Sequence, residues 1–420
     1  TFLMYGVGIL LTFAVQVLLT RLLGASIYGD YYFVLAWIMA LLVFAKFGVD
    51  NALLRFAPAY IAQKKWGLLK GLIRWGMVKA AWFSLVTTML LAILVAFYGE
   101  MSEQLQNTFY MGCIALPLLA FVYLRSALLK SFKHVVLALL PEAILAPAIL
   151  ALVMALIWVA APDELTSVDA MIATVVGLAI SGLVGHLLVV QKLPFELRNV
   201  PAVDNRIVWS RSSGAMLLIT GSHLVLNNTD AIMLGLLQDS TSVGIYAVAA
   251  KCSILIFFPL TIANATIAPL IPHYHALSER SHLQLALDRS MKLVTSVSVV
   301  VFCLVLVAGD KLLSIFGTEF EGGYLALVIL GVGALFNALA GPVANLLALT
   351  GSEVFVSRVM LATMVLNILL NLSFIPIWGL EGAALATAIS MLTWNLVMFL
   401  AVTRNLGLNP NRFLIRRPMP

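Results

Sequence analysis

Twelve apolar stretches between Thr1 and Asn405 constrain the fold of this chain more than any other feature. About 20 apolar residues, each rising about 1.5 Å along a helix, cross the ~30 Å hydrocarbon core of a bilayer. Within that core every segment must satisfy its own backbone hydrogen bonds, so the stretches are predicted to be helices. The predicted fold class is an all-α membrane protein with twelve transmembrane helices, at residues 2–20, 30–48, 76–98, 108–128, 136–161, 169–190, 209–229, 244–270, 291–308, 324–348, 358–377 and 382–403.

The composition excludes an ordinary soluble domain, because 62% of the residues are hydrophobic and only 10% are charged. Soluble domains carry about 25% charged residues. The three cysteines lie within apolar stretches, so no disulfide framework is expected. The first stretch is followed by eleven others and is interpreted as a span rather than a signal peptide; a few residues are expected to precede Thr1.

Lysine and arginine are distributed unevenly over the connectors, and this predicts the orientation of the chain. With the N-terminus inside, eighteen of them fall in the cytoplasmic connectors and the C-terminal tail, and only Arg21 and Lys311 fall outside. Cytoplasmic loops carry such an excess in membrane proteins. Both termini are therefore expected in the cytoplasm. The net charge of +6 is interpreted as a signal of this topology that also attracts anionic lipid head groups. No nucleic-acid partner is expected.

Two pairs of short motifs recur at nearly the same offset along the chain. Leu23-Gly24 and Leu234-Gly235 lie 211 positions apart, and residues 177–181 and 386–390 lie 209 positions apart. With six spans in each half, the halves share one orientation, as in transporters built from parallel repeats. The predicted organisation is two pseudo-symmetric six-helix lobes: an N-lobe at 1–190, a connector at 191–208, a C-lobe at 209–404 and a basic cytoplasmic tail at 405–420.

Five segments resemble one transporter family: residues 21–32 (RLLGASIYGDYY), 47–56 (FGVDNALLRF), 230–235 (DAIMLG), 243–246 (VGIY) and the run 367–390. They are similar to the polysaccharide-transporter branch of the multidrug/oligosaccharidyl-lipid/polysaccharide (MOP) exporter superfamily, which includes the Wzx-type O-antigen flippases. The resemblance implies alternating access of two six-helix lobes. It also implies export of a polyprenyl-pyrophosphate-linked oligosaccharide from the inner to the outer leaflet, for the synthesis of cell-surface polysaccharide.

A related branch of the superfamily flips the peptidoglycan precursor and departs from this pattern. Its members have two more helices and carry arginines in the first span. Here twelve spans are predicted, and residues 2–20 contain no charge. The peptidoglycan branch is therefore disfavoured.

Basic residues inside or beside the spans are candidates for binding an anionic lipid head. A charge at the bilayer centre costs about 2.5–3.5 kcal/mol on insertion scales, so an ionisable residue there is a functional candidate. Lys251 lies about 10 Å into its span at 1.5 Å per residue, facing either a polar path or an acidic partner. Arg55 belongs to a family-like segment, and its guanidinium suits bidentate phosphate binding. Lys46 and Arg125 either line a cationic inner mouth or extend to the lipid head groups. Arg21, near the outer end of its span, either receives the head or pairs with Asp30.

Three acidic residues are candidates for coupling or gating. Glu142 follows Pro141 in a span that the proline is expected to break, which suits either a gate or the cap of a bent helix. Asp230 either pairs with Lys251 across a hairpin, which we favour, or binds a coupling cation, Na⁺ or H⁺. Asp50 lies in the same family-like segment as Arg55. No other cofactor is expected, and the three histidines at 273, 275 and 282 lack the spacing of a metal site.

Three functions remain open on the sequence, and the first is preferred: a lipid-linked oligosaccharide flippase. The second is a cation-coupled multidrug antiporter of the same superfamily, and the third a membrane glycosyltransferase or polymerase. Short outer loops and the lack of a catalytic carboxylate cluster argue against an enzyme. The lack of an ATP-binding motif predicts transport driven by an ion gradient, the membrane potential or substrate flux. The expected partners are the lipid-linked oligosaccharide, membrane lipids and a polysaccharide polymerase with other assembly proteins. The expected location is the bacterial inner membrane.

Overall fold

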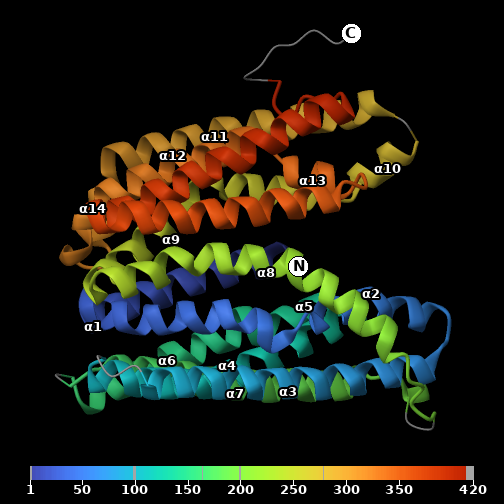
Figure 1. The fold of residues 1–420 in the computed structure, drawn as a ribbon, viewed down its shortest axis with the longest axis horizontal. Helices are drawn as coiled ribbons and strands as arrows, with labels where there is room; N and C mark the ends of the chain where they lie inside the picture. Colours follow the sequence, from blue (N-terminus) through green and yellow to red (C-terminus); the bar gives the residue numbers. More distant parts are fainter. Residues whose placement is uncertain (1, 98–100, 163, 198–199, 278, 413–420) are drawn as a thin grey trace. The chain divides into compact units, whose positions relative to one another are not determined.

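The computed structural model describes residues 2–97, 101–162, 164–197, 200–277 and 279–412, and the regular structure of these residues is entirely helical (Figure 1). The predicted all-α class is confirmed. Nine of the described helices are long and apolar enough to cross a membrane. The chain is therefore a multi-pass membrane protein, whereas the count of twelve spans and the cytoplasmic termini stay predictions.

The chain divides into two compact units, residues 1–228 and residues 229–420. The division falls inside helix α8 (Arg206–Leu237), about twenty residues after the connector at 191–208 that the sequence suggested. Helix α8 therefore begins in unit 1 and ends in unit 2. The two lobes are joined by a continuous helix, and the proline-containing loop before it belongs to unit 1.

Unit 1 is organised around helix α4 (Glu103–Ser131), which packs along α7 and also against α1, α2 and α3 (Figure 1). A long stretch of α4 is buried because small and apolar residues follow one another with no charge between Gln104 and Tyr123. The other helices of this unit are α1 (Phe2–Lys46), α2 (Val49–Ala62), α3 (Trp66–Phe97), α5 (Val135–Leu139), the π-helix η1 (Leu140–Leu145), α6 (Ala146–Ala160) and α7 (Ser167–Lys192), followed by the 3₁₀ turn η2 (Phe195–Leu197).

Unit 2 is organised around helix α12 (Tyr324–Ala340), which packs against α9, α11 and α14 (Figure 1). Its glycines at 331 and 333 allow this, because a Cβ at either position would lie 3.0 Å from the Phe302 ring or from the α-carbon of Ala388. The remaining elements are α9 (Ser240–Ile267), α10 (Leu270–Ala276), α11 (Arg280–Ser314), η3 (Thr318–Gly323), α13 (Val343–Ala348), α14 (Glu353–Ala401) and η4 (Val402–Leu406).

The two longest helices are each broken at one glycine. Helix α1 has 45 residues and a non-helical Gly24 (φ 71°, ψ 175°), and α14 has 49 residues and a non-helical Gly379 (φ 54°, ψ −128°). At 1.5 Å per residue each is roughly twice as long as the hydrocarbon core is thick. Each break falls between two predicted spans, so each long helix corresponds to a pair of them.

Two segments differ from their predicted structure. The predicted span 324–348 is interrupted, because α12 ends at Gly341 (φ 80°) and Pro342 lacks the amide that a continuing helix needs. The predicted connector between the second and third spans is mostly helical, forming α2 and the first turns of α3. Helix α2 has 14 residues and is too short to cross a bilayer, so a search for membrane spans does not detect it.

The loop before α8 is anchored to unit 1 by specific contacts. The amide of Val203 donates to the carbonyl of Gly67 (2.9 Å), and Lys70 Nζ donates to the carbonyl of Val200 (2.9 Å). Trp209 is completely buried, and its indole N–H donates to the hydroxyl of Tyr60 (3.0 Å). These contacts explain why the start of α8 belongs to unit 1.

The predicted basic tail begins as a packed segment of unit 2. Gln284 bonds with the amide (2.9 Å) and the carbonyl (2.8 Å) of Asn409, so its side chain pairs with the tail backbone. Asn411 is buried and donates to Thr295 Oγ1 (3.0 Å) and to the carbonyl of Leu339 (2.8 Å). Residues 413–420, which include two of the predicted tail arginines, lie outside the described residues.

Candidate functional sites

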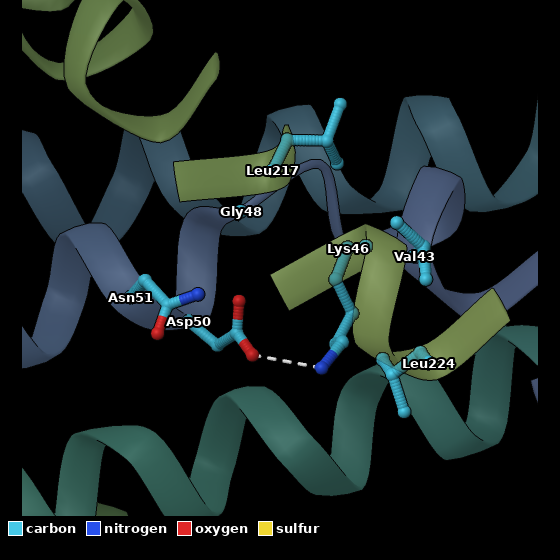
Figure 2. A pocket seen from close by; sticks show the side chains of 8 residues that line it. Val43, Lys46, Gly48, Asp50, Asn51, Leu217 and Leu224 are labelled. Carbon is cyan, nitrogen blue, oxygen red and sulfur yellow. Dashed lines mark hydrogen bonds and ion pairs between the residues drawn. The ribbon is translucent and has the colours of Figure 1, made fainter. Parts of the chain in front are cut away.

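A buried ion pair lies where α1 ends and α2 begins. Lys46 Nζ is 2.8 Å from Asp50 Oδ2, and the two side chains are only 7% and 16% exposed. The pair borders a small pocket whose other walls are Val43, Gly48 and Asn51 on one side and residues 217, 221 and 224 of α8 on the other. Figure 2 shows the two side chains pointing toward each other along this pocket.

The turn between the two helices places the pair. Phe47 (φ 46°) and Gly48 (φ 66°) both adopt left-handed backbone conformations, which a bulky residue such as phenylalanine rarely does. A Cβ at Gly48 would lie 2.3 Å from the carbonyl oxygen of Ser213, so α8 leaves no space for a side chain there. The Phe47 ring stacks on Phe83 at 4.1 Å between centroids, which fixes the turn from the other side.

The Lys46 side chain is buried within unit 1. Its ammonium is covered by the Asp50 carboxylate and by the ring of Tyr123, whose centroid is 4.6 Å away. The structure thus pairs Asp50 with Lys46, whereas the sequence had grouped Asp50 with Arg55. The spacing of four residues is that of an ion pair on one helix face, but here a turn with two left-handed residues brings the two side chains together.

Arg55 lies one turn further along α2 and is exposed. One of its terminal nitrogens donates to Ser212 Oγ of α8 at 3.3 Å, and its guanidinium carbon lies 5.4 Å from the Phe56 ring centroid. Lys79 of α3 approaches the same stretch of α8, because its ammonium lies 3.4 Å from Ser210 Oγ. Unit 1 therefore gathers three cations, Lys46, Arg55 and Lys79, around the end of α1 and the start of α8.

Arg125 lies apart from this group. Its guanidinium carbon is 4.4 Å from the Phe121 ring centroid on the same helix, and its buried Nε has no hydrogen-bond partner. His186 of α7 is close enough to interact with its charge, and the Nδ1 of that histidine is also unpartnered. The sequence had placed Arg125 beside Lys46 at an inner mouth; the structure directs it toward α7.

Glu142 lies in the π-helix η1, directly after Pro141. The predicted proline break is thus realised as a π-helical turn, because the proline cannot supply the amide of a regular helix. The buried Oε2 of Glu142 has no hydrogen-bond partner, although its charge acts on Tyr123. Its role in gating stays a prediction.

Two predicted basic residues stand outside these groups. Arg21 is exposed and lies three residues before the break at Gly24. Lys251 is half-buried in the middle of α9, and no ion pair in the described part of the chain involves it. The predicted pairing of Lys251 with Asp230 is therefore wrong.

Asp230 is instead held by four uncharged donors in unit 2. Its Oδ2 accepts from the Tyr246 hydroxyl (2.6 Å) and from the Thr387 hydroxyl, and its Oδ1 accepts from Asn371 Nδ2 (2.7 Å) and Asn367 Nδ2 (3.3 Å). Asp230 is only 5% exposed, and both asparagines are fully buried. These five residues, from α8, α9 and both parts of α14, are called the Asp230 site below.

The Asp230 carboxylate is buried without a basic partner in the described chain. Taking an ionised carboxylate out of water costs several kcal/mol, and no basic residue of the described chain forms an ion pair with this one. The buried Oδ1 of Asn371 has no hydrogen-bond partner. Hard cations prefer carboxylate, amide and hydroxyl oxygens as ligands. The four neighbours instead turn their donors to Asp230, and Asn367 Oδ1 accepts from Asn371 Nδ2 at 3.1 Å, so the arrangement satisfies the carboxylate through hydrogen bonds.

Sequence reasoning had named Asp230 but favoured Lys251 as its partner, and it did not assign the four donors. Tyr246 belongs to one family-like segment, and Asn367, Asn371 and Thr387 to another, so the signal was in the sequence. What the sequence could not show is that the break in α14 brings both halves of that helix to one carboxylate.

Two family models match parts of the sequence. Residues 1–275 match the model described as polysaccharide biosynthesis protein, and residues 216–373 match the model MatE. Among curated proteins, the chain is 26% identical over 163 residues to a protein of Haloferax volcanii named probable low-salt glycan biosynthesis flippase Agl15. That match covers 38% of this chain and 34% of the relative, so the chain spans about a third of the length of that relative in the match.

Solved transporter structures share the fold. A multidrug resistance MATE family transporter of the MOP superfamily, in an inward-facing conformation, superposes with a TM-score of 0.74 at 13% identity, over 94% of each chain. The lipid II flippase MurJ, in an inward closed conformation, gives a TM-score of 0.68 at 13% identity, over 96% of this chain and 87% of MurJ. These likenesses show that the chain shares the fold of these two transporters. Because a family model matches well over half of its length, the chain belongs to the polysaccharide biosynthesis protein family.

Proposed function

We propose that this transporter is a flippase for a polyprenyl-pyrophosphate-linked oligosaccharide, which it moves from the inner to the outer leaflet by alternating access. The observation that carries the proposal is the group of cations around the end of α1, in which the buried Lys46 is joined by Arg55 and Lys79. A pyrophosphate diester is a dianion, and lysine and arginine are the residues that bind phosphate oxygens. The curated relative is itself named a glycan biosynthesis flippase.

The proposed driving force is a cation that binds at the Asp230 site. Asp230 supplies the charge, and the buried Oδ1 of Asn371, which has no hydrogen-bond partner, would supply a further oxygen ligand once the amide turns it to the cation. A cation or a proton there removes the cost of an isolated buried carboxylate. Cation binding in unit 2 is then linked to substrate movement by the same conformational change.

Complementation of a strain that lacks the chromosomal gene tests the substrate. The deletion strain should accumulate lipid-linked oligosaccharide in its membrane, and expression of the wild-type chain should restore surface polysaccharide. Arg55→Ala and Lys79→Ala should reduce export at normal protein levels. The matched controls are Arg74→Ala and Lys292→Ala, which remove exposed charges and should export normally. Normal export by both test variants would remove the proposed role of these charges.

The thermal unfolding midpoint of purified chain tests the cation. A ligand that binds only the folded state stabilises it, by about 2.7 kcal/mol at a hundredfold excess over the dissociation constant. We expect the midpoint to rise with NaCl relative to choline chloride, or with falling pH if a proton is the ligand. Asp230→Asn should abolish whichever response is seen. A response that survives in Asp230→Asn would place the cation elsewhere.

A cation-coupled multidrug antiporter is the second candidate, favoured by the match of residues 216–373 to the MatE model. Such a transporter needs an acidic site for cationic drugs, and the charges gathered in unit 1 are mainly basic. Drug sensitivity of the deletion strain distinguishes the two. Normal sensitivity together with lost polysaccharide supports the flippase, and the reverse supports the antiporter.

The proposed setting is the cytoplasmic membrane, with membrane lipids around the transporter and a polysaccharide polymerase acting on its product. The sequence favoured a bacterial inner membrane. A curated relative comes from the archaeon Haloferax volcanii. The proposed location is therefore a cytoplasmic membrane, in either a bacterium or an archaeon.

A further inference from the structure

We propose that Asp50 is a built-in competitor for the anionic head of the substrate: its carboxylate holds the Lys46 ammonium until a pyrophosphate group displaces it, and takes the lysine back when the head leaves. The inference rests on the proposed function, because it concerns how the same site binds and releases its ligand. It assigns Asp50 a role in setting affinity, distinct from the gating role that the sequence suggested.

The geometry singles out Asp50 as a removable partner. Its carboxylate is the one acid in the described chain that pairs with Lys46, at 2.8 Å. Both residues border the small pocket beside α8, and Asp50 is the more exposed of the two side chains (Figure 2). The ammonium also lies over the Tyr123 ring, 4.6 Å from its centroid. An anion that entered the pocket would therefore meet Lys46 in the direction that Asp50 now occupies.

The backbone around the pair stays in place while the side chains exchange partners. The left-handed turn at Phe47 and Gly48 is held by Phe83 on one side and by the Ser213 carbonyl on the other. Lys46 ends α1 on one side of this turn, and Asp50 lies in the first turn of α2 on the other side. Lysine carries its charge on a flexible four-carbon stem, so its ammonium can turn to a new anion without moving the helix.

Exchange of one anion for another avoids a bare buried charge. Uncovering an ammonium in a low-dielectric site is costly, and Asp50 spares the empty transporter that cost. Only molecules in which Lys46 is free can bind the head, so the apparent affinity for substrate equals the intrinsic affinity multiplied by the fraction of such molecules. A transporter gains from this, because a head that is bound too tightly on one side is not released on the other.

Binding of farnesyl pyrophosphate to the purified full chain in nanodiscs tests the inference. Asp50→Asn should bind this probe about tenfold more tightly than wild type, because Lys46 is then permanently available. Lys46→Met should bind it more weakly. In the double variant, Asp50→Asn should have no further effect, because the residue that it competes for is gone. In cells, Asp50→Asn should slow export despite the tighter binding.

The matched control is Asp204→Asn, which removes an acid of the same unit that is exposed and paired with Arg206. If the gain in affinity came only from a change in net charge, this control would show it too. Equal gains in the two variants, or an equal gain from Asp50→Asn in the Lys46→Met background, would overturn the competitor role.

A measurement on the wild-type chain avoids the risk that Asp50→Asn fails to fold. Displacement of the carboxylate should expose it, so carbodiimide labelling of Asp50, followed by mass spectrometry, should rise when farnesyl pyrophosphate is added. Labelling of Asp204 should stay constant. Unchanged labelling of Asp50 at saturating probe overturns the inference. Export by the wild type reports the flippase function separately, so the competitor role can fail while the proposed function stands.

Discussion

The side-chain amide of Asn411 donates a hydrogen bond of 2.8 Å to the carbonyl oxygen of Leu339, a carbonyl that the break after helix α12 leaves without a helical partner. In a continuing helix that carbonyl would accept from the amide of residue 343, which here bonds to Gly341 instead. A residue near the end of the chain thus completes the end of a helix seventy residues earlier. The tail is in this respect part of the fold of unit 2.

Asn411→Ala should therefore destabilise the protein. It removes two hydrogen bonds and leaves the Leu339 carbonyl unsatisfied in a buried site, at an expected loss of about 1–3 kcal/mol. The measurement is the unfolding midpoint in detergent. Asn405→Ala, which changes an exposed asparagine of the same segment, is the control and should change little. Equal midpoints for the two variants would show that the tail does not contribute to stability.

Gly71→Ala should release the loop before α8. A Cβ at Gly71 would lie 1.9 Å from the carbonyl oxygen of Val203, so the loop cannot pack against α3 with a side chain there. We expect faster cleavage of residues 191–205 by an added protease and a lower unfolding midpoint. Gly6→Ala is the control, because a Cβ at Gly6 meets nothing within 4 Å. Unchanged cleavage in Gly71→Ala would mean that this loop is not held by α3.

Tyr246→Phe should weaken the Asp230 site without changing its shape. The variant removes the 2.6 Å hydrogen bond to a buried carboxylate, and hydrogen bonds to charged groups contribute about 1.5–3 kcal/mol. We expect a loss of stability in that range, reduced when a cation or proton occupies Asp230. Tyr110→Phe, at a half-exposed hydroxyl, should stay within about 0.5 kcal/mol of wild type. Equal effects of the two variants would argue against an ionised Asp230.

Asp239→Ala should destabilise the start of α9 in a pH-dependent way. Asp239 is the N-cap and accepts from the Ser242 amide at 2.8 Å; hydrogen bonds from Ser242 hold the pKa of this exposed carboxyl below its ordinary value of 3.8. A lowered folded-state pKa means that the stabilisation is present above pH 4 and is lost as the pH falls through that lower pKa. At pH 7 the cost should be near the low end of about 0.5–2 kcal/mol, because the site is exposed.

The measurement is the unfolding midpoint of wild type and Asp239→Ala at pH 7 and near pH 3. The difference between the two should shrink at the lower pH. Asp239→Asn, which can cap the helix without a charge, should show no such change. A difference that grows on acidification would contradict the assignment of the cap to the ionised carboxylate.

The all-helical membrane fold follows from the sequence because a bilayer leaves a long apolar segment few alternatives to a helix. Gly24 and Gly379 could also be located in advance, since each falls between two apolar stretches of spanning length. Helix α2 was missed for the converse reason: a short amphipathic helix has no length requirement that a hydropathy pattern can detect.

The sites show the same division. The sequence by itself identified the costly residues, Lys46, Asp50 and Asp230, because a charge in an apolar stretch needs a reason to be there. Only the tertiary structure decided their partners. Asp230 meets asparagines more than a hundred residues away rather than Lys251, and Asp50 meets Lys46 across a left-handed turn. The partners of these residues depend on where the helices break and on which helix faces meet. Packing determines the breaks and the facing surfaces through contacts between residues far apart in the chain.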